Sequence, residues 1–264
     1  MTYSILSHRE VVNRFTDFVS KFNMSNPRVS GKYKHSFNVA DNCGIVASQM
    51  GLSRDDIELS WLIGILHDIG RFQQVVVANS FRDSKSFSHA DFGCKLLFED
   101  RLISKFCILK DWYSYIEKAI RYHSVYALPD SLTEREKMFC NIIRDADKIS
   151  IFQRANYVDF ELFHECTEQD VQASVISDGV FECLMEKKMI PYTILKSYAD
   201  YFLRMFGFYF GIVYPQSFEL LETQGFFYNL LNFKFVNVHN QEKFDKIKDK
   251  IMEHQQYMLS LVRK

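Results

Sequence analysis

The residues best suited to chemistry in this sequence are histidines and aspartates that stand near the ends of expected helices. The stretch LIGILHDIGRFQQ (62–74) places His67 and Asp68 side by side after an apolar run. A single histidine at a helix end usually caps the helix or faces solvent, so this pair alone indicates nothing. Three further histidines stand at similar points of the chain: His35, His89 and His123.

Two more carboxylates lie in the apolar segment IIRDADKI (142–149). A carboxylate buried without a partner costs several kcal/mol, so a buried aspartate normally pairs with a cation. Asp145 and Asp147 each share a helix face with apolar residues, and periodicity therefore leaves both open as the buried group. Imidazole and carboxylate groups converging from helix ends suit Mn, Fe, Co, Ni or Zn, with Mg also possible, rather than Ca.

The order of these motifs resembles the HD-domain superfamily of metal-dependent phosphohydrolases. His35 is followed by HDIGRF (67–72), HADFG (89–93), His123 and IIRDADKI (142–149). This series is particularly similar to the bacterial HDIG-type subgroup. The similarity is strong from about 35 to 155 and looser through the aromatic C-terminal part. Four motifs in one order are far more specific than a single His-Asp pair.

The resemblance implies a metal-ligand set. The residues that match a first metal site are His35, His67, Asp68 and Asp147. Asp147 is preferred to Asp145 because it matches the last ligand of the family pattern. His89 and His123 match the extra histidines of members with two metals, in which Asp68 would bridge. The alternative for these two histidines, around a single metal, is to support its ligands without binding it or to donate hydrogen bonds to the substrate.

The implied reaction is hydrolysis of a phosphomonoester or phosphodiester, with a nucleotide or related small phosphate ester as substrate. Such esters hydrolyse extremely slowly without a catalyst. Metal-bound hydroxide would attack phosphorus, and Asp68 would belong to the catalytic set. Basic side chains would neutralise the remaining charge. Arg71 and Lys148 are the best-placed residues, and weaker choices are Lys32, Lys34, Arg82 and Lys85. For each of them, a solvated surface charge is the alternative.

Departures from other HD relatives narrow the substrate. The segment IGRFQQ (69–74) lacks the Glu-Asp pair of relatives that hydrolyse (p)ppGpp, and YHSVYALP (122–129) lacks the signature of the class that cleaves cyclic di-GMP. Two rival functions stay open, because the same ligands could hold a di-iron pair that uses O₂, or could belong to a non-catalytic module that senses nucleotides.

The composition fits a protein rich in long helices. The 264 residues include only 10 Gly and 4 Pro, and 16% are aromatic. A net charge of −1 argues against a broad nucleic-acid-binding face, so no stable nucleic-acid complex is expected. The start lacks the layout of a signal peptide, and the most apolar stretch (205–214) is too short to cross a membrane. Six cysteines without a C-x-x-C pair indicate reduced thiols, and we expect a cytoplasmic location.

Helical periodicity predicts the elements that must position these residues. We expect helices over 8–22, 35–50, 53–70, 111–124 and 133–158, and one more that begins near 89. Loops are expected at 26–34 and 79–88. The long helix over 133–158 opens with a capping box of Thr133 and Glu136. Beyond 160 we expect three or four helices and one short strand at 232–238.

These elements predict an all-α fold. We expect a single HD-type domain over 1–264, with a helical core at about 30–160 and an aromatic-rich C-terminal helical extension at about 161–264. The stretch YADYFLRMFGFYFGIVYPQSF (198–218) is expected to be core, with a ligand pocket or a homo-oligomer face as alternatives.

Overall fold

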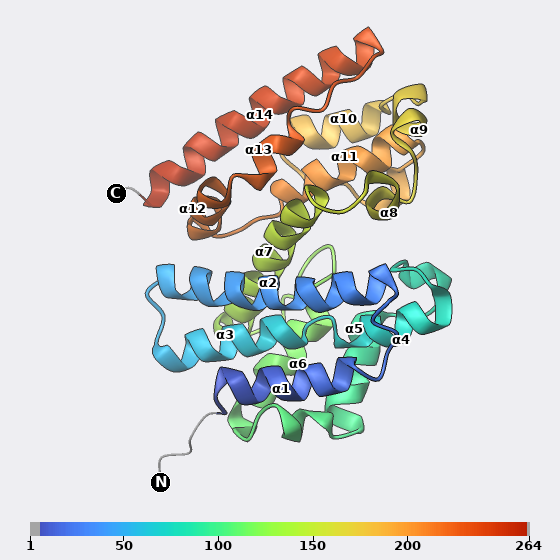
Figure 1. The fold of residues 1–264 in the computed structure, drawn as a ribbon. Coiled ribbons are helices and arrows are strands. Elements are labelled where there is room, and N and C mark those ends of the chain that lie inside the picture. The colour runs from blue at the N-terminus through green and yellow to red at the C-terminus, as the bar shows by residue number, and fades with distance from the viewer. Residues whose placement is uncertain (1–5, 263–264) are drawn as a thin grey trace. The chain divides into compact units, whose positions relative to one another are not determined.

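The computed structural model describes residues 6–262, which form two compact units (Figure 1). The units are Met1–Ala146 and Asp147–Lys264, so their boundary falls inside one continuous helix, α7. Every regular element of the described residues is helical, which confirms the all-α prediction. The single-domain organisation stays a prediction, and so does its division near residue 160.

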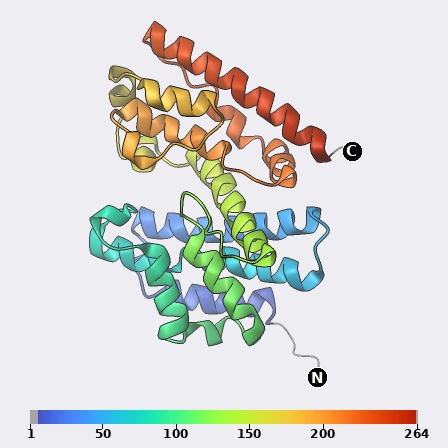
Figure 2. The ribbon, with the colours of Figure 1, turned by 180° about the vertical axis from the view of Figure 1, so that it is seen from behind.

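The first unit contains the helices that carry the histidines. In chain order they are α1 (His8–Val19), α2 (Pro27–Gln49), α3 (Arg54–Leu66), α4 (Ile69–Ala78), η1 (Asp83–Lys85), α5 (His89–Cys94), η2 (Lys95–Glu99), η3 (Leu102–Lys105), η4 (Lys110–Trp112) and α6 (Tyr113–Tyr122), followed by α7 (Glu134–Ala155), which crosses the boundary. Helices α2 and α3 lie side by side, and the view from behind shows α5 next to α6 (Figures 1 and 2).

The α2–α3 pair is the frame of this unit. Ser53 caps α3 by accepting a hydrogen bond from the amide of Asp56. Almost the whole circumference of α3 is apolar and buried. Gly64 allows the close approach, because a Cβ atom there would stand 2.6 Å from Cα of Ala40 in α2. The backbones of the two helices therefore meet at this residue.

The expected loop at 26–34 was wrong, because α2 already begins at Pro27. The Asn26 side chain accepts a hydrogen bond from the amide of Arg28, and proline at the first helical position needs no amide partner. Gly31 is accommodated inside the helix. His35 consequently lies two turns inside α2 instead of opening a helix.

The expected end of the third helix at Gly70 was also wrong. Helix α3 ends at Leu66, and a new helix, α4, starts at Ile69. Gly70 lies in the first turn of α4, where a Cβ atom would stand 2.2 Å from the carbonyl oxygen of His89. The glycine thus serves close packing against α5, and the break between α3 and α4 falls on the His-Asp pair itself.

The helices expected near 89, over 111–124 and over 133–158 correspond to α5, α6 and α7, whereas the short helix η1 lies in the expected loop at 79–88. Ser88 caps α5, and the capping box of α7 has both of its bonds: the Thr133 amide donates to Glu136, and the Glu136 amide donates to the Thr133 hydroxyl. Arg144, on α7, donates to the carbonyl oxygens of Tyr122 and Tyr126 and so fixes the turn that follows α6.

The second unit is an aromatic-cored helical bundle. Its described helices are α8 (Phe160–His164), α9 (Glu168–Ala173), α10 (Asp178–Met185), η5 (Tyr192–Ile194), α11 (Tyr198–Tyr209), α12 (Pro215–Gln224), α13 (Phe226–Leu230) and α14 (Val238–Val262). They outnumber the three or four expected because several have only five to eight residues. Phe206 and Tyr209 of α11 are buried against Phe227 and Phe244, so this part of the aromatic stretch is core.

The strand expected at 232–238 is absent from the described residues. Phe233 and Phe235 do alternate, but both rings pack against Phe202 and Phe244 in the core. No neighbouring strand offers a hydrogen-bond ladder in the described part of the chain, and Asn237 instead caps α14 by accepting from the amide of Asn240. The alternating sequence pattern at 232–238 therefore arises because Phe233 and Phe235 are packed against the core in a segment that has no regular secondary structure.

The structure also bears on the expected absence of a membrane span and on the expected reduced cysteines. Among residues 6–262, no helix combines the length and the apolar character that a membrane span requires. All six cysteines are free thiols, and five of them are buried.

Replacing Gly64 by alanine tests the frame. We expect Gly64→Ala to lower the free energy of unfolding by about 1–3 kcal/mol, since the added methyl group meets backbone that cannot rotate away. Gly44→Ala on α2 is the matched control, because its Cβ would make only an ordinary contact, 3.8 Å from Trp61. It should be neutral or stabilising by up to about 1 kcal/mol. Urea denaturation measures both, and a Gly64→Ala variant as stable as the Gly44→Ala variant would contradict the prediction.

Candidate metal centre

The carboxylate of Asp68 is the centre around which the predicted residues gather. It is buried at 2% exposure, in the break between α3 and α4. Four histidines that the sequence singled out surround it, and each is at most 5% exposed: His35, His67, His89 and His123. They come from α2, the end of α3, the start of α5 and the end of α6.

The two oxygens of Asp68 face different histidines. Oδ2 lies 3.3 Å from Nε2 of His67 and 3.8 Å from Nε2 of His35. Oδ1 lies 3.4 Å from Nε2 of His89 and 3.5 Å from Nε2 of His123. One carboxylate therefore stands between two pairs of imidazoles, as a bridging ligand would.

The hydrogen bonds on the far side of three rings fix their tautomers. Nδ1 of His67 is 2.7 Å from the carbonyl oxygen of Gly64, and Nδ1 of His123 is 2.7 Å from that of Ile120. Nδ1 of His89 lies 2.8 and 2.9 Å from the two oxygens of Asp83. Carbonyl and carboxylate oxygens only accept, so each Nδ1 carries the proton. In the neutral rings, Nε2 then presents its lone pair toward Asp68.

This donor arrangement fits a bound cation. Nε2 of His89 and Nε2 of His123 are 3.0 Å apart, and two lone pairs at that distance repel unless a positive charge lies between or beside them. Oδ1 of Asp68 is buried and accepts no hydrogen bond from the described residues. Metal-binding histidines characteristically donate their other ring nitrogen to a carbonyl or carboxylate, as these three do.

Burial and neighbouring charge act on the site's pKa values. Burial by itself would raise the pKa of Asp68, but the Lys32 ammonium and His67 hold it well below its ordinary value. Burial, with the nearby charge of Arg71, lowers the pKa of His89 to about 4. The site therefore presents an ionised carboxylate and a neutral imidazole at pH 7, which are the protonation states that bind metal.

Asp147 joins the cluster through helix α7. Its carboxylate and the ring nitrogens of His35 and His67 offer ligand atoms within 4.8 Å of one another, and His67, Asp68 and His123 form a second such group. Asp145 is fully buried but belongs to neither group in the described part of the chain. The geometry thus favours the same aspartate as the family pattern, a choice that periodicity left open.

The basic residues predicted to contact phosphate differ in how close they lie to Asp68. Arg71 has Nε 3.4 Å from Oδ1 of Asp68. Lys32, a weaker choice from the sequence, is buried and pairs directly with Oδ2 of Asp68. It lies one turn before His35 on α2, which the expected loop at 26–34 concealed. Lys148 is buried, with its stem close to Gly211, and both residues belong to the second unit. Lys34 and Lys85 are exposed and Arg82 is half-buried.

Sequence reasoning missed Asp83 and Gln74. Burial would raise the pKa of Asp83, but hydrogen bonds from His89 and Gln74, with the charges of His89 and Arg71, lower it to about 2. Gln74 is fully buried and donates to Asp83 at 2.8 Å. In the sequence, Asp83 is only an acidic residue in the expected loop before the helix that begins with His89. Many loops contain such a residue, so nothing in the sequence singles it out.

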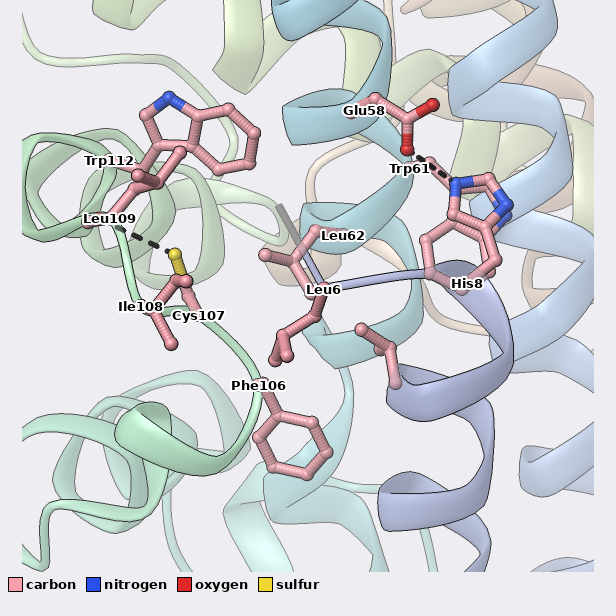
Figure 3. Close-up of a pocket in the computed structure, with 11 residues that line it drawn as sticks. Leu6, His8, Glu58, Trp61, Leu62, Phe106, Cys107, Ile108, Leu109 and Trp112 are labelled. Carbon is pink, nitrogen blue, oxygen red and sulfur yellow. Dashed lines mark hydrogen bonds and ion pairs between the residues drawn. The ribbon is translucent and has the colours of Figure 1, made fainter. Parts of the chain in front are cut away.

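A separate pocket lies elsewhere in the first unit (Figure 3). Its walls are mostly apolar and include Trp61, Phe106 and Trp112. At one side His8 stacks on Trp61, with ring centroids 3.8 Å apart, and its Nε2 lies 2.7 Å from Glu58. No predicted ligand or phosphate-binding residue lines this pocket, so it is not part of the cluster around Asp68.

Comparison with known proteins gives one match. Residues 33–151 match the family model of the HD domain. The searches of curated proteins and of solved structures returned no match. The matched segment begins two residues before His35 and ends four residues after Asp147, so it contains the whole cluster. The match supports the HD-domain superfamily for residues 33–151, while the narrower HDIG-type subgroup stays a prediction.

Proposed function

We propose that this protein is a metal-dependent phosphohydrolase that cleaves a phosphomonoester or phosphodiester, with a nucleotide or related small phosphate ester as substrate. One observation carries the proposal: histidine pairs face both oxygens of the single buried carboxylate Asp68, with two cationic side chains beside it. The match to the HD domain, a family of mostly metal-dependent hydrolases, supports it.

The proposal assigns the ligands to two ions. The first ion would be held by His35, His67, Asp68 and Asp147, and the second by His89, His123 and the other oxygen of Asp68. The donor set suits Mn, Fe, Co, Ni or Zn, and Mg is compatible. Bound divalent ions supply an activated water near neutral pH and positive charge for the phosphoryl oxygens.

The chain's own residues bind and orient the ester. Arg71 and Lys32 both reach Asp68 from the same region as the histidines, and each can turn a donor toward a phosphoryl oxygen. Nη1 of Arg71 is already bonded to Gln74, Phe81 and Asp83, so the guanidinium would offer a phosphate oxygen its charge and its other terminal nitrogen, Nη2. The proposal assigns the phosphate contacts to these two residues before Lys148, whose stem packs close to Gly211. Self-association and cellular compartment stay predictions.

Metal binding is the first test. Purified protein should contain up to two transition-metal ions per chain, and chelation should abolish hydrolysis until metal is restored. His67→Ala should weaken metal binding by more than about 100-fold, beyond the loss typical of an outer-shell partner. His239→Ala, at an exposed histidine of α14, is the matched control. Elemental analysis measures both, and unchanged metal content in His67→Ala would contradict the ligand assignment.

Oxygen dependence separates the hydrolase from its di-iron rival. Protein loaded with Mn²⁺ or Fe²⁺ should release p-nitrophenol from p-nitrophenyl phosphate or its bis ester equally well with and without O₂. Product release that requires O₂ would instead support the oxygenase. Metal binding without turnover of any ester, including a nucleotide panel, would support the sensing module.

Arg71 provides the test of phosphate binding. Arg71→Ala should lower kcat/KM by about 10²–10³-fold, the usual cost of losing a preorganised charge at the reacting group. Arg54→Ala, at an exposed arginine of α3, should leave it unchanged. Steady-state kinetics at saturating metal measure the effect. A kcat/KM of Arg71→Ala within a few-fold of wild type would remove Arg71 from the site.

A further inference from the structure

We propose that Asp83 is a positioning residue that holds His89 in its metal-binding tautomer and holds the Arg71 guanidinium beside Asp68. The inference rests on the proposed function, because it concerns how that site is kept in order. Asp83 lies on η1, in the segment between α4 and α5, and contacts both of these side chains.

The contact with His89 is the first step of the argument. Both carboxylate oxygens of Asp83 lie within 2.9 Å of Nδ1 of His89. The ring is 1% exposed, so water offers no easy substitute for this acceptor. With the proton kept on Nδ1, Nε2 is left to face Asp68. Without the carboxylate, the proton is free to move to Nε2 and to occupy the lone pair that a metal would use.

The contact with Arg71 is the second step. Nη1 of Arg71 lies 3.0 Å from Oδ1 of Asp83, and the same nitrogen donates to Oε1 of Gln74 at 2.7 Å and to the carbonyl of Phe81. Gln74 in turn donates to Oδ1 of Asp83 at 2.8 Å. The three side chains therefore form a closed triangle. Nε of the same guanidinium lies 3.4 Å from Oδ1 of Asp68.

The anchoring of the turn is the third step. Gln74 is fully buried on α4, and its amide also donates to the hydroxyl of Ser86 and the carbonyl of Phe87. This fixes the end of the segment that carries Asp83. The Asp83 side chain itself is 40% exposed, and a surface acid of that kind usually contributes little to stability. Three donors converging on one half-exposed carboxylate indicate a role in geometry.

Asp83 variants should therefore act on one side of the cluster. Asp83→Ala should weaken binding of the ion held by His89 and His123 by about 10–100-fold and leave the ion held by His35 and His67 unaffected. At saturating metal, it should raise KM more than it lowers kcat, because Arg71 loses its clamp. Asp83→Asn keeps an acceptor for Nδ1 and should restore part of the metal affinity. Asp91→Asn is the matched control, because it removes an exposed carboxylate of α5 that pairs with Arg121 of α6.

Two readouts distinguish positioning from simple support of the fold. Titration of metal-free full-length protein with Zn²⁺ against a chromogenic chelator gives each site's affinity. Nitrogen-15 NMR of labelled histidines in metal-free protein gives the tautomer of each ring. Asp83→Ala should populate the Nε2–H form of His89 and leave His67 and His123 unchanged.

A double-mutant cycle tests the link between Asp83 and Arg71. Asp83→Ala and Arg71→Ala together should lower kcat/KM by less than the sum of their separate effects predicts.

The outcomes separate this inference from the proposed function. Wild type that binds Zn²⁺ but hydrolyses no ester would overturn the hydrolase, while the tautomer and affinity measurements would still decide the role of Asp83. An Asp83→Ala protein with an unchanged His89 tautomer and unchanged affinity at both sites would overturn the inference. So would equal weakening at both sites with a matching loss of stability, which a purely structural role predicts.

Discussion

The burial of one ionised carboxylate, Asp68, is the constraint on which the rest of the first unit depends. Removing such a charge from water costs several kcal/mol unless cations and hydrogen-bond donors replace the lost solvent. Here the replacement comes from Lys32 and Arg71, and from imidazoles on both sides of the group. These partners belong to different helices, so the charge can be buried only when those helices are correctly assembled.

The backbone meets this constraint with a break and two close contacts. Helix α3 ends at Leu66 and α4 begins at Ile69. His67 and Asp68 therefore lie at the junction, where their side chains are not confined to the face of one continuous helix. Gly64 brings α2 close enough to present His35, and Gly70 brings α5 close enough to present His89. Apolar packing between the helices thus fixes the positions of the buried histidines and of Asp68. These polar groups are stable in the interior because they also contact one another and the nearby cations.

The sequence predicted which histidines gather around Asp68 better than it predicted the local path of the chain. Histidines and aspartates in a specific order could be recognised because metal binding requires those residue types. The start of α2 at Pro27 and the separate helix α4 were missed, since Gly31 and Gly70 were interpreted as breaks when they sit inside helices. Asp83 could not be found, because its importance comes from a turn that folds back onto His89, and no residue type or spacing encodes that return.

The same bonds explain how a centre so rich in charge is held together. Lys32 and Arg71 balance the charge of Asp68, and Arg71 also forms an ion pair with Asp83. Under the proposed function, Asp68 would also hold divalent cations, and its attraction for Lys32 and Arg71 would be weaker. The ammonium and the guanidinium would then have positive charge to offer an anionic ester, and Asp83 would keep the guanidinium in place. Metal binding and phosphate binding would then be coupled through a single carboxylate, and each would strengthen the other.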